Sequence, residues 1–267
     1  MRGRRAPLSA LLAAPAAAGA ALLVIPLVAL VTRVPWTELH TLLAREEVGL
    51  ALRVSLVSAG LAAVTSVVLG VPLAWVLVHS RLPGRRLLRT LVTLPLVLPP
   101  VVGGLALLLA LGRHGLFGPL LEDAFGVRLA FSAAGVVVAE TFVAMPFLVV
   151  AVEGALRSAD GSAEEAAATL GAGPWRTFTR VTLPLIGPAV AAGAVLSFAR
   201  ALGEFGATIT FAGNLPGATQ TLPLAVYVAL ERDPRAAVAV ALLLLVAAVA
   251  VLALLRDRWL RPGTSPP

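Results

Sequence analysis

Six long apolar runs restrict the fold of this 267-residue chain more than any other feature. Each run has about 20 residues with few charges, the length that a helix needs to cross the hydrocarbon core of a bilayer. Charged residues make up only 13% of the chain, whereas they make up about 25% of a soluble domain. We therefore predict an all-α integral membrane protein. Its six predicted spans are Leu11–Val31, Val54–Val78, Leu91–Leu111, Ala133–Val152, Ala189–Phe211 and Ala236–Leu255.

The first and third runs have special features. Three arginines precede the first run, as in a signal peptide, but the run exceeds the about 7–15 residues of a signal-peptide core, so we expect an uncleaved helix. The third run contains Pro95, Pro99 and Pro100, and proline kinks a helix by removing a backbone donor. We expect it to be the least regular span.

The chain contains arginine but no lysine, and the distribution of its arginines predicts the orientation of the helices. If the N-terminus is cytoplasmic, thirteen arginines fall in cytoplasmic segments and seven in external ones, which fits the positive-inside rule. Seven acidic residues balance the external arginines, so the positive net charge lies on the cytoplasmic side. We expect a cell-membrane protein with both termini in the cytoplasm, whose basic residues contact lipid headgroups and no nucleic acid.

A long polar loop, about residues 153–187, separates the fourth and fifth runs and exceeds what a helix connection requires. Ser162 and Glu165 form the S-x-x-E pattern of a capping box, which predicts a helix over Ala163–Leu170. Gly171 suits the left-handed residue that ends such a helix. These residues predict the first half of a helical hairpin.

The second half of this hairpin is predicted over Pro174–Val181, because proline suits the first turn of a helix. Leu183-Pro184 is expected to end it, since the residue before proline is pushed away from helical geometry. From the residues alone, the hairpin is either a docking element for a cytoplasmic protein or an interfacial hairpin without a partner.

The same loop resembles the EAA loop of ABC-importer permeases. That pattern is E-A-A, three residues, glycine, nine residues, an aliphatic residue, one residue and L-P. The resemblance implies the type I importer fold with cytoplasmic coupling helices over residues 54–256, an extra N-terminal helix with an external loop in 1–53, and a cytoplasmic tail in 257–267. The matching residues are Glu165, Ala166, Ala167, Gly171, Val181, Leu183 and Pro184.

This resemblance implies that the first hairpin helix is a coupling helix seated in a groove of a cytoplasmic ATPase subunit. Glu165 would face the partner, and Ala166 and Ala167 would permit close approach. Phe178 and Leu183 would pack the loop against the membrane helices. The chain has no G-x-x-x-x-G-K motif, so we expect a chain that is no enzyme and binds no cofactor, with ATP used by the separate ATPase.

One coupling loop on six spans would make half of a pore, so we expect a homodimer with two ATPase subunits. The external loops are too short for a receptor domain, so an extracytoplasmic binding protein would deliver the substrate. An ion-coupled secondary transporter is the rival, but such proteins usually contain internal repeats, and an EAA-like loop has no role in them. An intramembrane enzyme would need a catalytic constellation, and the spans contain no familiar one.

The fifth run and the loop after it resemble molybdate and sulfate permeases. Both kinds share the G-E-F-G sequence found at residues 203–206. The neighbouring sequences G-A-T-I-T-F, G-N-L-P-G and T-Q-T-L-P, within residues 206–223, are closer to molybdate permeases. The resemblance implies an oxyanion importer, with molybdate or tungstate as the expected substrate and sulfate or thiosulfate as the alternative.

Three ionisable residues, Glu140, Arg200 and Glu204, lie within the predicted spans, where charges are costly and therefore candidates for function. Arg200 and Glu204 are four residues apart and can pair on one helix face. A pair between Arg200 and Glu140, a gating role and direct contact with the oxyanion are the alternatives.

Small and turn-forming residues surround this charged pair. Gly203 and Gly206, near Ala199 and Ala207, are expected to let helix backbones approach closely. Asn214 begins an N-L-P-G sequence typical of a turn. The resemblance implies that this loop enters the membrane from outside and shapes the external gate; an ordinary surface loop is the alternative.

Overall fold

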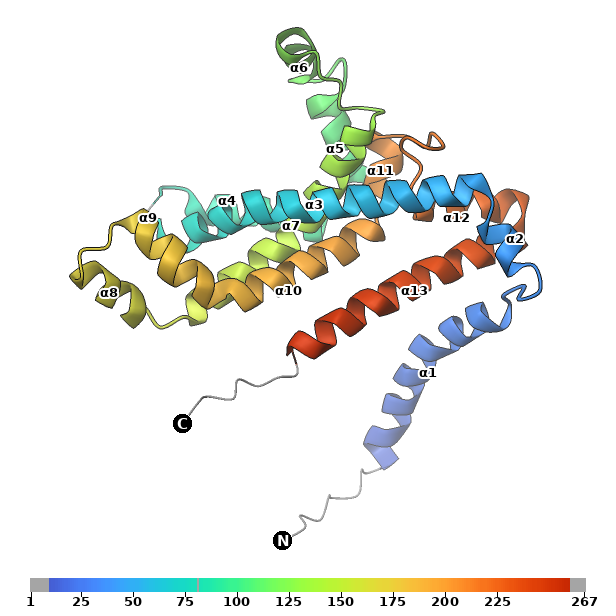
Figure 1. Ribbon diagram of the computed structural model, residues 1–267, viewed down its shortest axis with the longest axis horizontal. Coiled ribbons are helices and arrows are strands. Elements are labelled where there is room, and N and C mark those ends of the chain that lie inside the picture. Colours follow the sequence, from blue (N-terminus) through green and yellow to red (C-terminus); the bar gives the residue numbers. More distant parts are fainter. Residues whose placement is uncertain (1–9, 81, 260–267) are drawn as a thin grey trace.

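The computed structural model describes residues 10–80 and 82–259, which are almost entirely helical (Figure 1). Among them, five helices are long and apolar enough to cross a membrane, and a bent pair of helices makes a sixth apolar stretch. The predicted all-α membrane architecture is confirmed. In chain order the elements are α1 (Ala10–Thr32), α2 (Leu39–Leu43), α3 (Glu46–His79), α4 (Arg85–Thr93), η1 (Leu94–Leu96), α5 (Pro100–Leu111), α6 (Gly118–Phe125), α7 (Ala133–Ser158), α8 (Ser162–Thr169), α9 (Pro174–Thr177), η2 (Phe178–Thr182), α10 (Leu183–Leu202), α11 (Gly206–Phe211), α12 (Leu222–Arg232) and α13 (Pro234–Trp259).

Helices α3, α7 and α10 form the centre of the molecule and make its most extensive contacts. Toward one end of this bundle, large apolar side chains such as Leu77, Leu148 and Ile186 are fully buried together. In the middle, small residues such as Ala59 and Ala144 replace them. Small side chains let helices approach closely in a membrane, where packing rather than water exclusion holds helices together.

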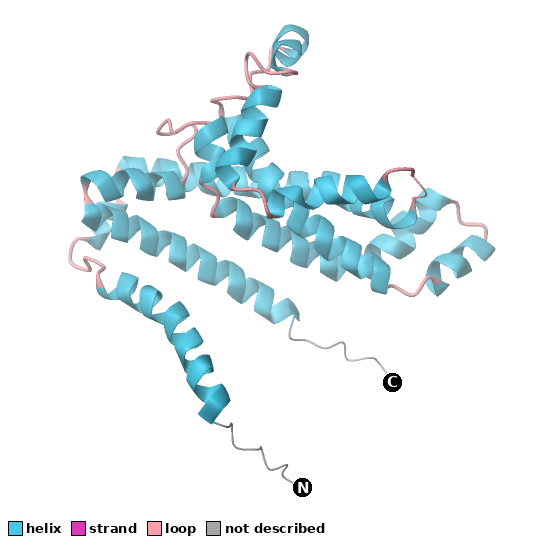
Figure 2. Ribbon diagram, turned by 180° about the vertical axis from the view of Figure 1, so that it is seen from behind, coloured by secondary structure: helices cyan, strands magenta, loops and turns pink. Residues whose placement is uncertain are grey.

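The two ends of the bundle differ in what they carry (Figure 1). We call the end with α8 and α9 the α8 end, and the end with α2 and α12 the α2 end. Helix α13 packs against α12 and lies along the bundle, and α1 diverges from it in both views (Figures 1 and 2). The apolar stretch of α1 is 0% buried, so its side chains face lipid or another chain.

The third apolar run is bent, as its prolines predicted. The axis turns by 119° between Arg85–Leu96 and Pro100–Leu111, because Pro99 adopts an extended ψ of 130° and Pro100 begins a new helix. Helix α4 follows the bundle, whereas α5 leaves it steeply and carries α6 outward (Figure 1). The predicted span Leu91–Leu111 therefore contains a sharp break, and the bent pair counts as a sixth span if its two halves are taken together.

The fifth apolar run is broken as well. Helix α10 ends at Leu202, and the short helix α11 begins at Gly206 after a non-helical step. The predicted span to Phe211 was wrong, because the apolar residues after the break belong to a separate helix packed against α5 and α7. Helix α12, in the following segment, was not predicted.

The hairpin at the α8 end has the predicted helix, glycine corner and helix, and Gly171 has a left-handed φ of +81°. The capping box was wrong: Ser162 is the first helical residue and makes no capping bond with its side chain. Its backbone N–H instead donates to the Asp160 carboxylate at 2.8 Å. Asp160, the residue before the N-cap Gly161, therefore accepts one of the free N–H groups at the start of α8, the role that the sequence pattern attributed to Ser162.

The second helix of the hairpin does not end at Leu183-Pro184, contrary to prediction. It passes through the π-helical turn η2 into α10, so that Pro174–Leu202 is one apolar helical stretch. Pro184 lies in the first turn of α10, and the wider turn before it changes the hydrogen-bonding pattern that a proline would otherwise break.

Both predicted boundaries between the parts of the chain fall within helices. The expected boundary after residue 53 falls inside α3, which begins at Glu46 and is continuous across it. The expected tail 257–267 begins within α13, which extends to Trp259, and residues 260–267 lie outside the described part of the chain.

Candidate functional site

The residues that match the EAA pattern divide between surface and interior. Glu165, Ala166 and Gly171 are exposed at the α8 end, and Ala167 is half-buried. Leu183 packs against the buried cluster of α3, α7 and α10, as does Phe178. The hairpin thus presents α8 outward while its second half is anchored in the bundle, and Pro184 is exposed beside that anchor.

Arginines of α4 hold the α8 end together. Arg85 donates to the carbonyl oxygens of Val78 and Ser80 at 3.1 and 3.0 Å, which satisfies acceptors that the end of α3 leaves free. Arg89 pairs with Glu153 of α7 at 2.6 Å. From the sequence, these arginines indicated the topology alone, and their contacts were not predicted.

Arg200 and Glu204 form the ion pair that their spacing predicted, with Nη1 2.6 Å from Oε2. The Glu204 side chain is 1% exposed and that of Arg200 27%. The other carboxylate oxygen of Glu204 accepts the backbone N–H of Ala207 at 2.8 Å. One buried carboxylate therefore joins the end of α10 to the first turn of α11 across the break.

Glu140 is also buried, but it does not pair with Arg200 in the described part of the chain. Its Oε1 accepts a hydrogen bond of 2.9 Å from Ser58 of α3. Ser55, one turn earlier, accepts the backbone N–H of Leu222 at 2.7 Å. These contacts connect α7, α3 and α12 through buried polar groups. Sequence reasoning missed both serines; their i, i+3 spacing in an apolar run was the available signal.

Gly206 lies where α11 crosses α5, and the predicted close approach of helices occurs there. A Cβ atom on Gly206 would lie 2.9 Å from Pro100 Cβ, and one on Gly104 would lie 2.7 Å from the Ala207 carbonyl oxygen. Gly203 is exposed at the break, and a Cβ there would approach only its own helix, at 3.8 Å from the Ala199 carbonyl oxygen. A close approach of a second subunit at Gly203 stays a prediction.

The loop that contains Asn214 is a turn, as its composition predicted. Gly213 and Gly217, with φ of +78° and +76°, enclose it. The backbone N–H of Leu215 donates to the Thr219 hydroxyl at 2.8 Å and fixes the turn. The Asn214 side-chain oxygen is buried and has no hydrogen-bond partner among the described residues.

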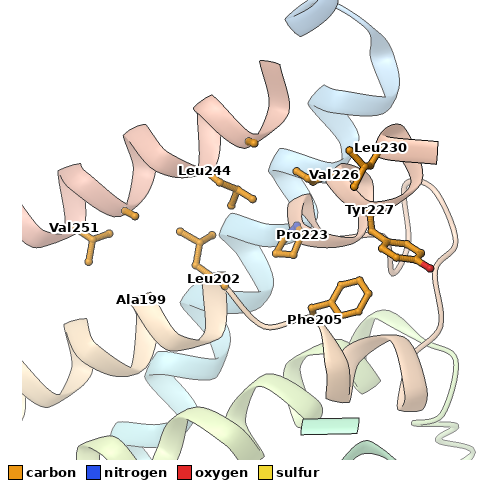
Figure 3. A pocket seen from close by; sticks show the side chains of 12 residues that line it. Ala199, Leu202, Phe205, Pro223, Val226, Tyr227, Leu230, Leu244 and Val251 are labelled. Atoms are coloured by element: carbon orange, nitrogen blue, oxygen red, sulfur yellow. The ribbon is translucent and has the colours of Figure 1, made fainter. Parts of the chain in front are cut away.

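An apolar cavity of about 690 Å³ opens beside the break, between α10, α12 and α13 (Figure 3). Leu202 and Leu244 line one part of it, and the rings of Phe205 and Tyr227, whose centres are 5.4 Å apart, line another. None of its described lining residues is charged. Its chemistry suits an apolar occupant and not an oxyanion.

Comparison with known proteins agrees with this architecture. The family model described as "Binding-protein-dependent transport system inner membrane component" matches residues 66–265. The molybdenum transport system permease protein ModB of Mycobacterium tuberculosis is 53% identical over 237 residues, which cover 89% of each chain. The sulfate transport system permease protein CysT of Escherichia coli is 38% identical over 235 residues, covering 86% of this chain and 84% of the relative.

A solved structure shares the fold. It is that of a bacterial alginate ABC transporter in complex with an alginate-bound periplasmic protein, and the match has a TM-score of 0.74 at 20% identity, covering 93% of this chain and 91% of that chain. This structural likeness shows the fold. The match of the family model over residues 66–265, with the 53% identity to the relative from Mycobacterium tuberculosis, shows that this chain belongs to the family of binding-protein-dependent transport system inner membrane components.

Proposed function

We propose that this chain is the membrane-spanning permease subunit of an ATP-driven importer, and that its substrate is molybdate. The observation that carries the substrate is the 53% identity, over 89% of both chains, with a relative named as a molybdenum permease. The relative named as a sulfate permease reaches 38%. Tungstate, which has the same tetrahedral shape and charge, would follow molybdate, and sulfate or thiosulfate is the alternative substrate.

A cytoplasmic ATPase subunit is the proposed partner of α8. The outer face of this helix exposes Glu165 and the small residue Ala166. Leu170, directly after the helix, is 88% exposed. Small residues permit close approach, and an exposed leucine gains free energy on burial. The chain itself is a pore-forming subunit and not an enzyme; ATP would be bound and hydrolysed by the ATPase.

A second copy of the chain is the proposed partner of α5 and α6. These helices and the turn between them project from the bundle (Figure 1) and expose apolar side chains, including Val101, Leu105, Leu109, Leu116 and Leu120. Two such arms would bury each other and enclose a pathway between the subunits. The α10–α11 break, with Arg200, Gly203, Glu204 and Gly206, and the Asn214 turn would then line or gate this pathway.

The proposed orientation puts the α8 end in the cytoplasm and the α2 end outside, where a binding protein would deliver the substrate. At the α2 end, arginines are neutralised: Arg45 pairs with Asp233 at 3.0 Å and Arg235 with Glu38 at 2.9 Å. From the α2 end, α13 runs back along the bundle toward the α8 end (Figure 1), which agrees with a cytoplasmic C-terminus and the positive-inside rule.

Uptake into proteoliposomes tests the proposal. The chain is reconstituted with its ATPase and binding protein, and radiolabelled molybdate is measured with and without ATP inside the vesicles. We expect ATP-dependent uptake that excess tungstate suppresses and equimolar sulfate does not. Equal competition by sulfate would establish the sulfate alternative. Uptake driven by an ion gradient without ATP would establish the secondary transporter, which family membership argues against.

A further inference from the structure

Glu164, the residue before the E-A-A sequence, connects α8 to two membrane helices. The hydroxyl of Thr182, at the end of η2 and directly before α10, donates a hydrogen bond of 2.5 Å to Glu164 Oε1. The imidazole Nε2 of His79, the last residue of α3, lies 3.7 Å from Glu164 Oε2. One side chain of α8 thus contacts the ends of both α3 and α10.

The exposure pattern of α8 separates Glu164 from the proposed docking residues. Its side chain is 30% exposed and Thr182 is buried at 2%, whereas the neighbouring Glu165 and Ala166 are exposed. Ala167, three residues on, is half-buried and shares the inner face with Glu164. The inner face of α8 therefore contacts the bundle, while the outer face remains exposed for the proposed ATPase subunit.

Both partners of Glu164 are themselves held in place. The ring of His79 stacks on Trp75 with centres 5.1 Å apart, and Trp75 meets the ring of Phe178 edge-on at 6.0 Å. Phe178 belongs to η2, the element that carries Thr182. The aromatic contacts thus join the end of α3 to the start of α10 and give Glu164 a common, packed anchor.

The chain connections of α8 are, by contrast, flexible by composition. Gly161 precedes the helix, and Gly171 and Gly173 follow it. Glycine adopts more backbone conformations than any other residue, so a force on α8 could rotate the helix about its two ends without moving the bundle. A direct side-chain contact between α8 and the bundle would prevent this independent rotation.

We propose that Glu164 is a positioning residue that clamps α8 to α3 and α10, so that displacement of α8 by an ATPase moves both membrane helices. This inference rests on the proposed function, because it requires a motor that displaces α8. Glu164 acts through Thr182 and His79 and contacts neither ATP nor substrate. Loss of the clamp would let ATP hydrolysis continue while transport falls.

The test measures molybdate uptake and ATP hydrolysis together in proteoliposomes that contain the complete transporter. For Glu164→Ala and for Thr182→Val we expect the uptake per ATP hydrolysed to fall about fivefold, in the range by which single substitutions change coupling between sites. Glu164→Gln should retain most of the ratio, because its amide oxygen still accepts from Thr182. The double variant should be no worse than Glu164→Ala alone, because that substitution already removes the contact with Thr182.

Thr90→Val is the matched control. Thr90 is exposed on α4, and its hydroxyl bonds only within that helix, to the Arg86 carbonyl oxygen at 3.1 Å, so its removal should leave the ratio unchanged. Copurification of the ATPase verifies that each variant assembles. A normal ratio in an assembled Glu164→Ala transporter overturns the clamp alone, whereas absent ATP-dependent uptake in the wild type overturns the proposed function and the clamp with it.

Discussion

At the scale of single residues, the Glu204 carboxylate has a separate partner for each oxygen, Arg200 on α10 and the backbone N–H of Ala207 on α11. Glu204→Ala would leave Arg200 without a counter-charge in apolar surroundings. It would also leave the backbone N–H of Ala207, in the first turn of α11, without its acceptor. Removal of one partner of a buried pair costs about 3–5 kcal/mol. We expect a marked loss of thermal stability in detergent and loss of transport.

Graded variants separate the two contacts of Glu204. Glu204→Gln retains an oxygen for the Ala207 N–H and should lie between wild type and Glu204→Ala in melting temperature. Arg200→Met combined with Glu204→Gln removes the unpaired charge as well, so it should melt above Glu204→Gln alone. A Glu204→Ala protein as stable as wild type would show that neither contact supports the break.

Two of the buried charged residues also show what sequence can predict at this scale. The Arg200–Glu204 pair was predictable because i, i+4 residues face one another on any helix. The contact of Glu140 with Ser58 joins residues 82 positions apart and depends on the packing of α3 against α7. The sequence placed Glu140 within a span but could not name its partner.

At the scale of elements, α11 lies so close to α5 that Gly104 has no room for a side chain. A Cβ atom on Gly104 would lie 2.7 Å from the Ala207 carbonyl oxygen, and a backbone atom cannot rotate away as a side chain can. We expect Gly104→Ala to cost about 1–3 kcal/mol, as overpacking typically does. Thermal unfolding in detergent measures this loss.

Gly60→Ala is the control for Gly104→Ala. Gly60 lies within α3, and no neighbouring atom of the described chain lies within 4 Å of its Cβ position. Alanine is a better helix former than glycine by up to about 1 kcal/mol, so this variant should be neutral or more stable. Equal changes in stability for the two substitutions would contradict the close packing of α11 against α5.

The start of α8 depends on Asp160, which lies outside the membrane spans. Its carboxylate accepts the backbone N–H of Ser162, and this hydrogen bond lowers the pKa of Asp160 from its ordinary value. A lowered pKa means that the cap is present at neutral pH and is lost as pH falls through the folded-state pKa, below the ordinary range for aspartate.

Hydrogen exchange at the first amides of α8 tests this cap. We expect Asp160→Ala to exchange faster at neutral pH, whereas Asp160→Asn, which keeps the acceptor, should stay close to wild type and lose the acid dependence. Unchanged exchange in Asp160→Ala would mean that this hydrogen bond does not stabilise the start of α8.

The structural features that could be predicted were those caused by residues close to them in the sequence. The bend of the third run follows from its prolines, and the corner at Gly171 from the freedom of glycine at positive φ. The break after Leu202 was missed because apolar composition is the same in a spanning helix and in a short buried helix such as α11. The capping residue was misassigned because Asp160 and Ser162 both suit the start of a helix.

At the scale of the whole molecule, the apolar runs predicted the membrane helices but not their arrangement. Nothing local in α5 and α6 indicates that they leave the bundle, or in α1 that it diverges (Figure 2). Such placements depend on surfaces that other chains or lipid cover, so they are properties of an assembly. The arginine distribution is a global property that a sequence does carry, and it makes a prediction about the orientation of the entire chain.

Orientation can be measured directly because the chain contains no cysteine, so a single introduced thiol is the only one present. Thr37 is exposed near α2 and Thr169 at the end of α8. With a membrane-impermeant maleimide, Thr37→Cys should react in intact cells and Thr169→Cys only after permeabilisation. The unmodified chain is the control and should not react. Labelling of Thr169→Cys in intact cells would put α8 outside, beyond the reach of a cytoplasmic ATPase, and no coupling through Glu164 or Glu165 could then operate.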